Sequence, residues 1–403
     1  MLRVQDAIIV ICLYFTAFAS LESPAMNSVA LYLALPIAFL LSLWKNVCVE
    51  IDKYVNKYEW ILFFLLVWIF ISYLWADYYD LASQECHRCL GSLLLSFIFA
   101  SNATNKKMIP WLYLTFVVLY ISAWIYAQNH ILIDVTGAFE RESSRLSDAK
   151  LNANTMAYYT FFNSFILFMF GEIIENSFWK KVCRIVFLGV IPLSFVVALV
   201  TASRQVLVIQ IPLVSFMLYY RYWEKVKWTY RIIAVTVLVI SCFAMSGFVS
   251  STYENSFLAK RSEQSWNEDG RYVLFERALE TGFENFPLGV GAGNFRAYGG
   301  NISHCSFAEL WANQGIIGVA LYLWLICSFF KKQWQNYNIT KNRVCFLFIG
   351  FCVFFIVDNF FYVFYTDLWL ISFFILVATH GETYSKEHYS YLIYERRPML
   401  PRL

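Results

Sequence analysis

The chain has 403 residues, of which 60% are hydrophobic and 20% aromatic, and its formal net charge at pH 7 is +3. Its mean hydropathy is +0.54, and apolar runs recur from end to end, which excludes a soluble globular domain. Because runs of this length match helices that cross a bilayer, the sequence predicts an all-α, polytopic membrane protein.

About twelve apolar segments are predicted to span the membrane. They are residues 7–22, 28–44, 59–76, 87–101, 108–127, 154–171, 182–200, 204–220, 230–250, 305–330, 343–357 and 360–379. Basic clusters such as Lys106-Lys107, Lys180-Lys181 and Lys331-Lys332 fall in alternate connectors. Because cytoplasmic connectors carry an excess of Lys and Arg, both termini are predicted to be cytoplasmic and the long connectors 127–153 and 251–303 to lie outside. We expect residues 1–403 to form a single integral membrane domain with 251–303 as its large outer loop.

The first polar motif in chain order is Cys86-His-Arg-Cys89, at the outer start of a span. A pair with this spacing is typical of a disulfide or of half a metal site. The sequence offers no second ligand pair, so packing at a helix end is the favoured interpretation.

A polar stretch from Arg145 to Asn154 precedes the sixth predicted span. Asn152 and Asn154 are typical helix-capping residues, and capping is the favoured interpretation of this pair. Arg145 is expected to add to a cluster of cations on the outer side.

The pentad Thr201-Ala-Ser203-Arg204-Gln interrupts an apolar run that extends from about residue 185 to 220. This run is too long for one span, so a tight outer turn is predicted, with Arg204 at the start of the next helix. The Arg204 side chain can extend to lipid phosphates at the membrane edge. Alternatively, it stands among the helices and holds a phosphate, whose oxygens suit the planar guanidinium.

Asp269-Gly270 is predicted to begin a helix that runs to about Phe286 within the outer loop. Its apolar arc holds Leu274, Phe275, Ala278 and Leu279, and the opposite face holds Glu276, Glu280 and Glu284. Arg271 falls on the apolar arc, and Arg277 lies toward the polar side. A charge on an apolar face needs a buried partner or a phosphate, although fraying at the first turn is the alternative. The helix is expected to lie along the membrane surface.

The next segment, Pro287-Leu-Gly289-Val-Gly291-Ala-Gly293-Asn-Phe295-Arg296, carries three alternating glycines. Such glycines allow sharp turns and close backbone approach. Backbone N–H groups in this segment are also able to cradle a phosphate. The spacing fits neither the Walker nor the dinucleotide pattern, so a plain turn is favoured.

His304 closes the outer loop at a predicted helix start. A lone histidine at a membrane boundary is more often structural than catalytic, but Arg271, Arg277 and Arg296 share its loop. Gly315 and Gly318 follow on the helix it begins and are expected to allow close helix packing. A neutral imidazole is a plausible base for a hydroxyl nucleophile. Further on, Asp358 and Asp367 are expected to balance buried arginines.

These motifs together resemble the bacterial O-antigen ligase and Wzy-type polysaccharide polymerase superfamily. The resemblance rests on Thr201-Ala-Ser203-Arg204, on Gly270-Arg271 with the glycine-rich segment, and on His304 with Gly315-x-x-Gly318-Val. Cys305 departs from the family, which has Asn, Ser or Gln after the histidine. The motifs cover roughly residues 140–320.

The resemblance implies a C-type glycosyltransferase (GT-C-like) fold in the bacterial inner membrane, acting on the periplasmic or outer face. It implies an undecaprenyl-diphosphate-linked glycan as donor, with its lipid tail between spans, and a glycan or lipid A–core as acceptor. His304 is then the catalytic base, and Arg204, Arg271, Arg145 and Arg277 hold the diphosphate. Ser203, Gly291, Gly293, Gly315 and Gly318 support the site. No metal, cofactor or nucleic acid is expected, and a chain-length regulator is a conceivable partner.

Two activities of this superfamily share the same chemistry at the diphosphate. A polymerase joins lipid-linked repeat units, and a ligase moves the glycan onto lipid A–core. The stretch from Arg145 to Asn154 looks closer to the polymerase branch, which makes polymerase the leading expectation. A transporter of the lipid-linked glycan is a third alternative, but it predicts an internal repeat and broken helices at the midplane, and no two-half repeat is evident.

Overall fold

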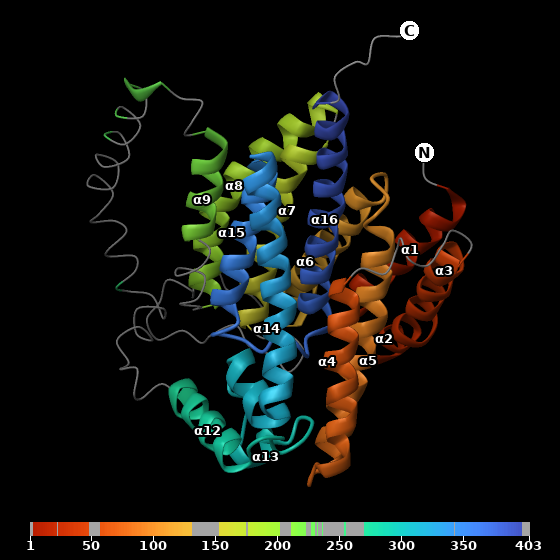
Figure 1. The fold of residues 1–403 in the computed structure, drawn as a ribbon, viewed down its shortest axis with the longest axis vertical. Helices are drawn as coiled ribbons and strands as arrows, with labels where there is room; N and C mark the ends of the chain where they lie inside the picture. Colours follow the sequence, from red (N-terminus) through yellow and green to blue (C-terminus); the bar gives the residue numbers. More distant parts are fainter. Residues whose placement is uncertain are drawn as a thin grey trace. The chain divides into compact units, whose positions relative to one another are not determined.

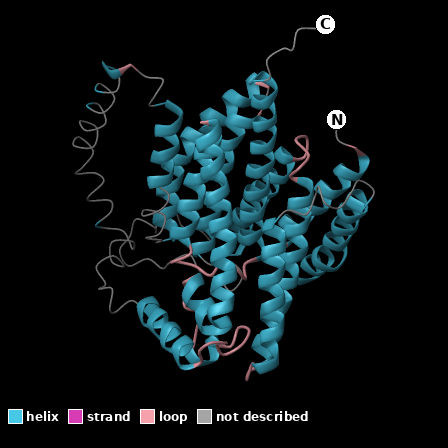
Figure 2. Cartoon of the chain, in the orientation of Figure 1, coloured by secondary structure: helices cyan, strands magenta, loops and turns pink. Residues whose placement is uncertain are grey.

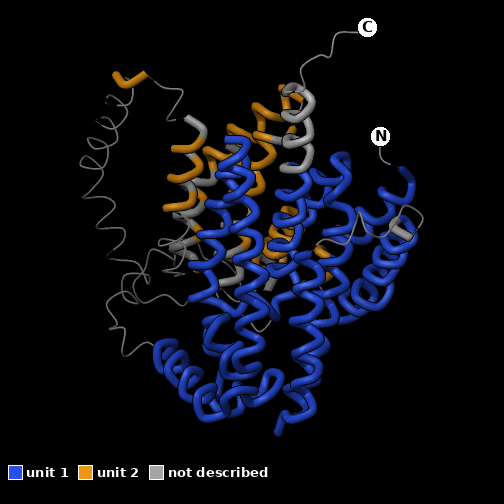
Figure 3. The backbone as a smooth tube through the Cα atoms, in the orientation of Figure 1, with its two compact units in different colours: residues 1–16, 24–115, 269–403 blue, residues 17–23, 116–268 orange. Residues whose placement is uncertain are grey.

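The computed structural model describes residues 3–47, 57–130, 153–201, 211–222 and 270–396, except positions 22, 175 and 342, with a few isolated positions between 227 and 254. Within these residues the secondary structure is helical and contains no strand (Figure 2). The chain divides into two compact units. The first comprises residues 1–16, 24–115 and 269–403, and the second residues 17–23 and 116–268 (Figure 3).

The helices, drawn in Figure 1, overlap most of the predicted spans, although several begin or end elsewhere. They are α1 (Val4–Ala19), α2 (Pro24–Val29), a π-helical turn (Ala30–Ala34), α3 (Leu35–Val47), α4 (Lys57–Ser72) with a 3-10 turn (Tyr73–Trp75), α5 (Tyr79–Asn102), α6 (Ile109–His130), α7 (Ala153–Ile173), α8 (Ser177–Thr201), α9 (Ile211–Tyr222), α12 (Gly270–Glu284), α13 (Phe295–Gly299), α14 (Ser306–Thr340), α15 (Arg343–Asp358) and α16 (Leu368–Arg396). The predicted span 230–250 lies outside the described residues.

Four stretches in the described part of the chain are helical, long enough and apolar enough to cross a membrane. They are Pro24–Lys45, Lys57–Trp75, Ile109–Ala127 and Ser306–Thr340, and Val4–Ala19, Val344–Asp358 and Leu368–Tyr384 are shorter apolar helices. The described part of the chain is therefore all-helical, and its long apolar helices are those of a membrane protein. The count of about twelve spans and the predicted orientation remain predictions.

The core of the first unit is built from aromatic rings on α14, α15 and α16. The Phe355 and Phe374 ring centroids lie 4.5 Å apart, and Phe329 packs edge-on against Phe374. Elsewhere in this unit, Lys45 forms an ion pair with the buried Asp6 at 2.6 Å. The packing of the Phe329, Phe355 and Phe374 rings fixes α14 against α15 and α16, and α14 carries the segment that follows His304.

The connection between α15 and α16 differs from the prediction. Residues 359–367 form a turn, and α16 begins only at Leu368, because Asp367 caps it by accepting the N–H groups of Trp369 and Leu370 at 3.0 and 3.1 Å. Asp367 is thus a helix cap rather than a residue within the last span. The interpretation of Asp358 as the partner of a buried arginine is also wrong within the described residues, because both of its buried oxygens lack a hydrogen-bond partner.

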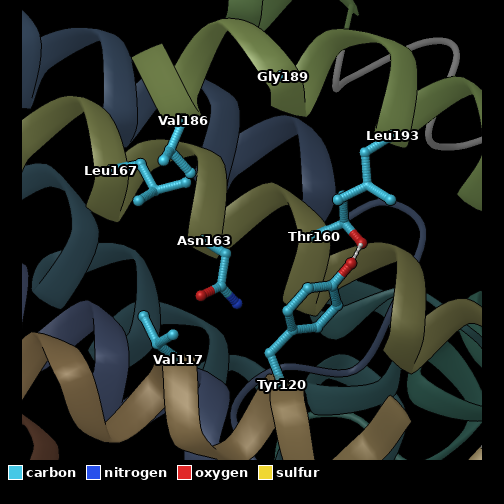
Figure 4. A pocket seen from close by; sticks show the side chains of 8 residues that line it. All are labelled: Val117, Tyr120, Thr160, Asn163, Leu167, Val186, Gly189 and Leu193. Atoms are coloured by element: carbon cyan, nitrogen blue, oxygen red, sulfur yellow. Dashed lines mark hydrogen bonds between the residues drawn. The ribbon is translucent and has the colours of Figure 1, made fainter. Parts of the chain in front are cut away.

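The second unit contains a cavity of about 430 Å³ between α6, α7 and α8 (Figure 4). Its walls are mostly apolar, and its polar groups are Tyr120, Thr160 and Asn163. The hydroxyls of Tyr120 and Thr160 bond to each other at 2.9 Å, and Asn163 donates to the Tyr159 carbonyl. The polar groups of this cavity are therefore largely paired within the protein.

Candidate functional site

The centre of the site is a break in α14 at Gly315, which has φ +61° and ψ −157°. A break of this kind leaves the carbonyls of the preceding turn without their helical donors. Here Val290 and Gly291 donate their N–H groups to the carbonyls of Ala312 and Asn313, both at 2.9 Å. The indole of Trp68 donates to the Gln314 carbonyl at 2.9 Å. The glycine-rich segment thus supplies hydrogen-bond donors to carbonyls that the break in α14 leaves without helical partners.

The bonding in this contact runs in both directions, because Ile316 donates its N–H to the Pro287 carbonyl at 3.1 Å. Gly315 is therefore the point at which Pro287 reaches the helix backbone, and not a site of close helix packing. Gly318 lies nearest to the side chain of Gln314 on its own helix. The expected packing role of these two glycines is wrong, whereas their support of the site stays a prediction.

Glycine is required in the 287–295 segment by close approach as well as by backbone conformation. Gly291 has φ +92°, and a Cβ there would lie 2.8 Å from Ala76, at the joint between α4 and α5. The N–H groups of Gly289, Val290 and Gly291 all donate to protein carbonyls. This arrangement fits the plain turn and leaves these three groups unable to cradle a phosphate.

Asn294 ties the same segment to the start of α5. Its Oδ1 accepts the N–H of Tyr78 at 2.7 Å, and its Nδ2 donates to the Ala292 carbonyl at 2.9 Å. One turn later, the Tyr298 hydroxyl donates to Asp77 at 2.6 Å, a bond that raises the pKa of Tyr298 to about 12. The short helix α13 is therefore anchored to the α4–α5 joint, and with it the loop that leads to His304.

Helix α12 packs on the first turns of α14 (Figure 1). The shared core, which we call the α12–α14 core, holds the buried residues Ala278, Val290, Phe295, Cys305, Ala308 and Ala312, with Phe275 and Leu279 partly buried against it. Glu276, Glu280 and Glu284 are exposed. The predicted apolar and acidic faces of this helix are confirmed.

Two of the predicted arginines, Arg271 and Arg277, are on α12, the helix that packs on α14. Arg271 is half-buried, in agreement with its predicted place on the apolar arc. Arg277 is exposed, and its guanidinium donates to the Gly299 carbonyl at 3.4 Å. Arg145, Ser203 and Arg204 lie outside the described residues, as does Asn152, so the remainder of the predicted set is untested.

His304 is half-buried and adopts a left-handed backbone conformation with φ +59°. Such a conformation is uncommon for a residue with a side chain, and it costs free energy that the surroundings must offset. Cys305 follows as the N-cap of α14 and makes no side-chain cap hydrogen bond, although its sulfur faces the N–H groups of Phe307 and Ala308. His304 is therefore a fixed residue at the loop-to-helix junction, as the sequence predicted.

Two buried acids lie beside this junction, Glu309, which is the next candidate for the base after His304, and Glu85, which no local sequence signal marks. Glu85, which precedes the predicted span 87–101, and Glu309 are both almost fully buried. Glu85 is hydrogen-bonded to Tyr365, whose hydroxyl also accepts from Asn313 at 3.4 Å. Burial raises the pKa of Glu85, opposed by the nearby charges of Arg296 and Arg88. No sequence signal pairs Glu85 with residues more than 200 positions away.

The two buried thiols of the Cys86–Cys89 motif are free, which favours packing over a disulfide. Among the described residues, no three or more His, Cys, Asp or Glu side chains gather as metal ligands do.

The helical architecture, with helices long and apolar enough to cross a membrane, defines an integral-membrane class of protein. A model of the O-antigen ligase family matches residues 188–323, a range that holds α12, the glycine-rich segment, His304 and the break in α14. This part of the chain is therefore similar to the O-antigen ligase family, and the resemblance found in the sequence is confirmed. No curated protein matched the chain.

Proposed function

We propose that the protein is a glycosyltransferase that joins undecaprenyl-diphosphate-linked glycan repeat units at the outer face of the bacterial inner membrane. The observation that carries this proposal is the packing of α12 on the segment that follows His304, through the α12–α14 core. One cation-bearing helix and one histidine are thereby brought to the same end of the first unit.

In this proposal, His304 is the general base. It takes the proton from an acceptor hydroxyl as the oxygen forms a bond to the sugar carbon that carries the diphosphate, and the carbon–oxygen bond to the diphosphate breaks. Base catalysis of this kind contributes typically about 10²–10⁴-fold. A rigid junction suits this role, because a general base must lie within hydrogen-bond reach of the proton it abstracts.

Arg271, Arg277, Arg204 and Arg145 are proposed to receive the diphosphate. Charge-assisted hydrogen bonds from guanidinium groups offset the negative charge that builds on the leaving group. This is why we propose a reaction that needs no metal ion. Addition of a chelator to the purified protein is expected to leave the rate unchanged, and restoration of a lost rate by Mg²⁺ would contradict this part of the proposal.

The alternative function is an O-antigen ligase that moves the glycan to lipid A–core, and the name of the matching family favours keeping it. The test is reconstitution in vesicles with a synthetic undecaprenyl diphosphate glycan, with and without lipid A–core. A ladder of lipid-linked repeats supports the polymerase, and a capped lipid A–core supports the ligase. Movement of the lipid-linked glycan across the vesicle without a new glycosidic bond would contradict both and indicate a transporter.

A further inference from the structure

The residues on both sides of His304 are held by a set of buried hydrogen bonds. The Ser303 hydroxyl donates to the Cys305 carbonyl at 3.0 Å and accepts the Cys305 N–H at 3.2 Å. A single side chain thus bridges the backbone across His304. Because Ser303 and Cys305 are each only 1% exposed, water does not compete for these bonds.

A second constraint on this segment is a hydrogen bond from Ser303 to the first turns of α14. Glu309 Oε2 accepts the backbone N–H of Ser303 at 2.6 Å. This separation is short for an N–H···O hydrogen bond. Glu309 is 3% exposed and lies on α14, whose next turn is hydrogen-bonded to the glycine-rich segment, so its position is fixed by packing and by these bonds.

These hydrogen bonds flank His304, whose backbone is in a strained conformation with φ +59°. Strained backbone persists only where the surroundings over-determine it, and it is concentrated at functional sites. The bonds of Ser303 and Glu309 supply that determination. The His304 side chain between them is half-buried, and its Nδ1 atom is buried.

We propose that Glu309 and Ser303 are positioning residues, which hold the backbone of His304 in its left-handed conformation and so aim the imidazole at the acceptor hydroxyl. This inference rests on the proposed function, because the acceptor hydroxyl is the target of the imidazole only in that reaction. In this inference Glu309 accepts the hydrogen bond of the Ser303 N–H and is not itself the catalytic base.

The test compares Glu309→Gln with Glu309→Ala and Ser303→Ala. Gln keeps an acceptor oxygen for the Ser303 N–H, whereas Ala removes it. Glu276→Gln, on the exposed face of α12, is the matched control. Two readouts are used: steady-state glycan transfer by the reconstituted protein, and the rate at which diethyl pyrocarbonate modifies His304, measured by peptide mass spectrometry against the exposed His87 in the same molecule.

We expect Glu309→Ala and Ser303→Ala to lower kcat by about 10–100-fold, since misplacing a catalytic group by about 1 Å has an effect of this size. The KM for the donor is expected to stay within about threefold, since donor contacts remain. The labelling rate of His304 relative to His87 should shift in both Ala variants, and Glu309→Gln and Glu276→Gln should behave as the wild type in both readouts.

The proposal is overturned if Glu309→Gln is as inactive as Glu309→Ala with unchanged His304 labelling, because Glu309 would then act through its charge or as the base. It is also overturned if both Ala variants keep wild-type kcat and labelling. A wild-type protein that transfers no glycan would instead refute the proposed function. The labelling readout does not need activity and would still decide whether Glu309 holds His304.

Discussion

Pro287 and Gly315 meet where α14 is interrupted: the Pro287 carbonyl receives the N–H of Ile316 at 3.1 Å, and a Cβ at Gly315 would collide with that same oxygen. The loop before His304 and the helix after it are therefore one structural unit. The break leaves none of the carbonyls of residues 312–314 without a hydrogen-bond donor, because Val290, Gly291 and Trp68 donate to them.

Gly315→Ala is predicted to destabilise the protein severely. Its φ of +61° alone costs an L-residue about 1–3 kcal/mol, and the collision with Pro287 adds to this. The thermal unfolding midpoint of the purified protein in detergent is the measurement. Gly270→Ala is the control, because no atom lies within 4 Å of an added Cβ there. Equal midpoints for the two variants would refute the importance of the contact.

His304→Ala is predicted to abolish detectable transfer, as loss of a general base lowers the rate by about 10²–10⁴-fold. Donor binding should remain largely intact, because the arginines are unchanged. Single-turnover assays together with a donor-binding assay check this. Near-normal turnover by His304→Ala would mean that another residue is the base.

Arg271→Ala is predicted to lower transfer about tenfold or more, because a hydrogen bond to a charged group contributes about 1.5–3 kcal/mol. Arg271→Lys should recover part of the rate, since it restores the charge without the planar fork. The same pair of substitutions at Arg204 is expected to behave alike. The comparison requires equal amounts of protein in the membrane, and full activity of both Ala variants would rule out the assignment.

Cys305→Ser is predicted to be tolerated and to raise the unfolding midpoint slightly. Position 305 is the N-cap of α14 and has no side-chain cap bond, whereas a serine oxygen accepts helix N–H groups and contributes about 1 kcal/mol. Cys305→Ala removes the thiol without adding a cap and serves as the control. A serine variant less stable than the alanine variant would show that the thiol fills space that a hydroxyl does not tolerate.

The orientation of the chain is open to a direct test by cysteine labelling in intact cells. Ala297, which is exposed on α13, is predicted to be outside, and the Lys331-Lys332 pair inside, from the alternation of basic connectors. A cysteine at Ala297 should react with a membrane-impermeant reagent, and one at Lys332 only after permeabilisation. The reverse result would place His304 on the cytoplasmic face and overturn the proposed function.

Local patterns in the sequence were enough to predict the helical segments, the two faces of α12 and the place of His304. Apolar runs of span length predicted the helical segments, because burial in a membrane needs a continuous apolar stretch. The period of 3.6 residues assigned the faces of α12, and Ala278 and Glu276 lie on the faces so predicted. His304 was found because a histidine at a loop-to-helix junction is a local signal.

Only the tertiary structure decided what the glycines and the acids do. Gly315 reads as a small residue for helix packing, whereas its role depends on a carbonyl at Pro287, nearly 30 positions away. Glu85 and Glu309 are ordinary acids in the sequence, and their burial near Arg296 follows from how α5, α13 and α14 meet. Local patterns report the period and polarity of one segment, but a hydrogen bond between distant segments depends on their packing, which no single segment encodes.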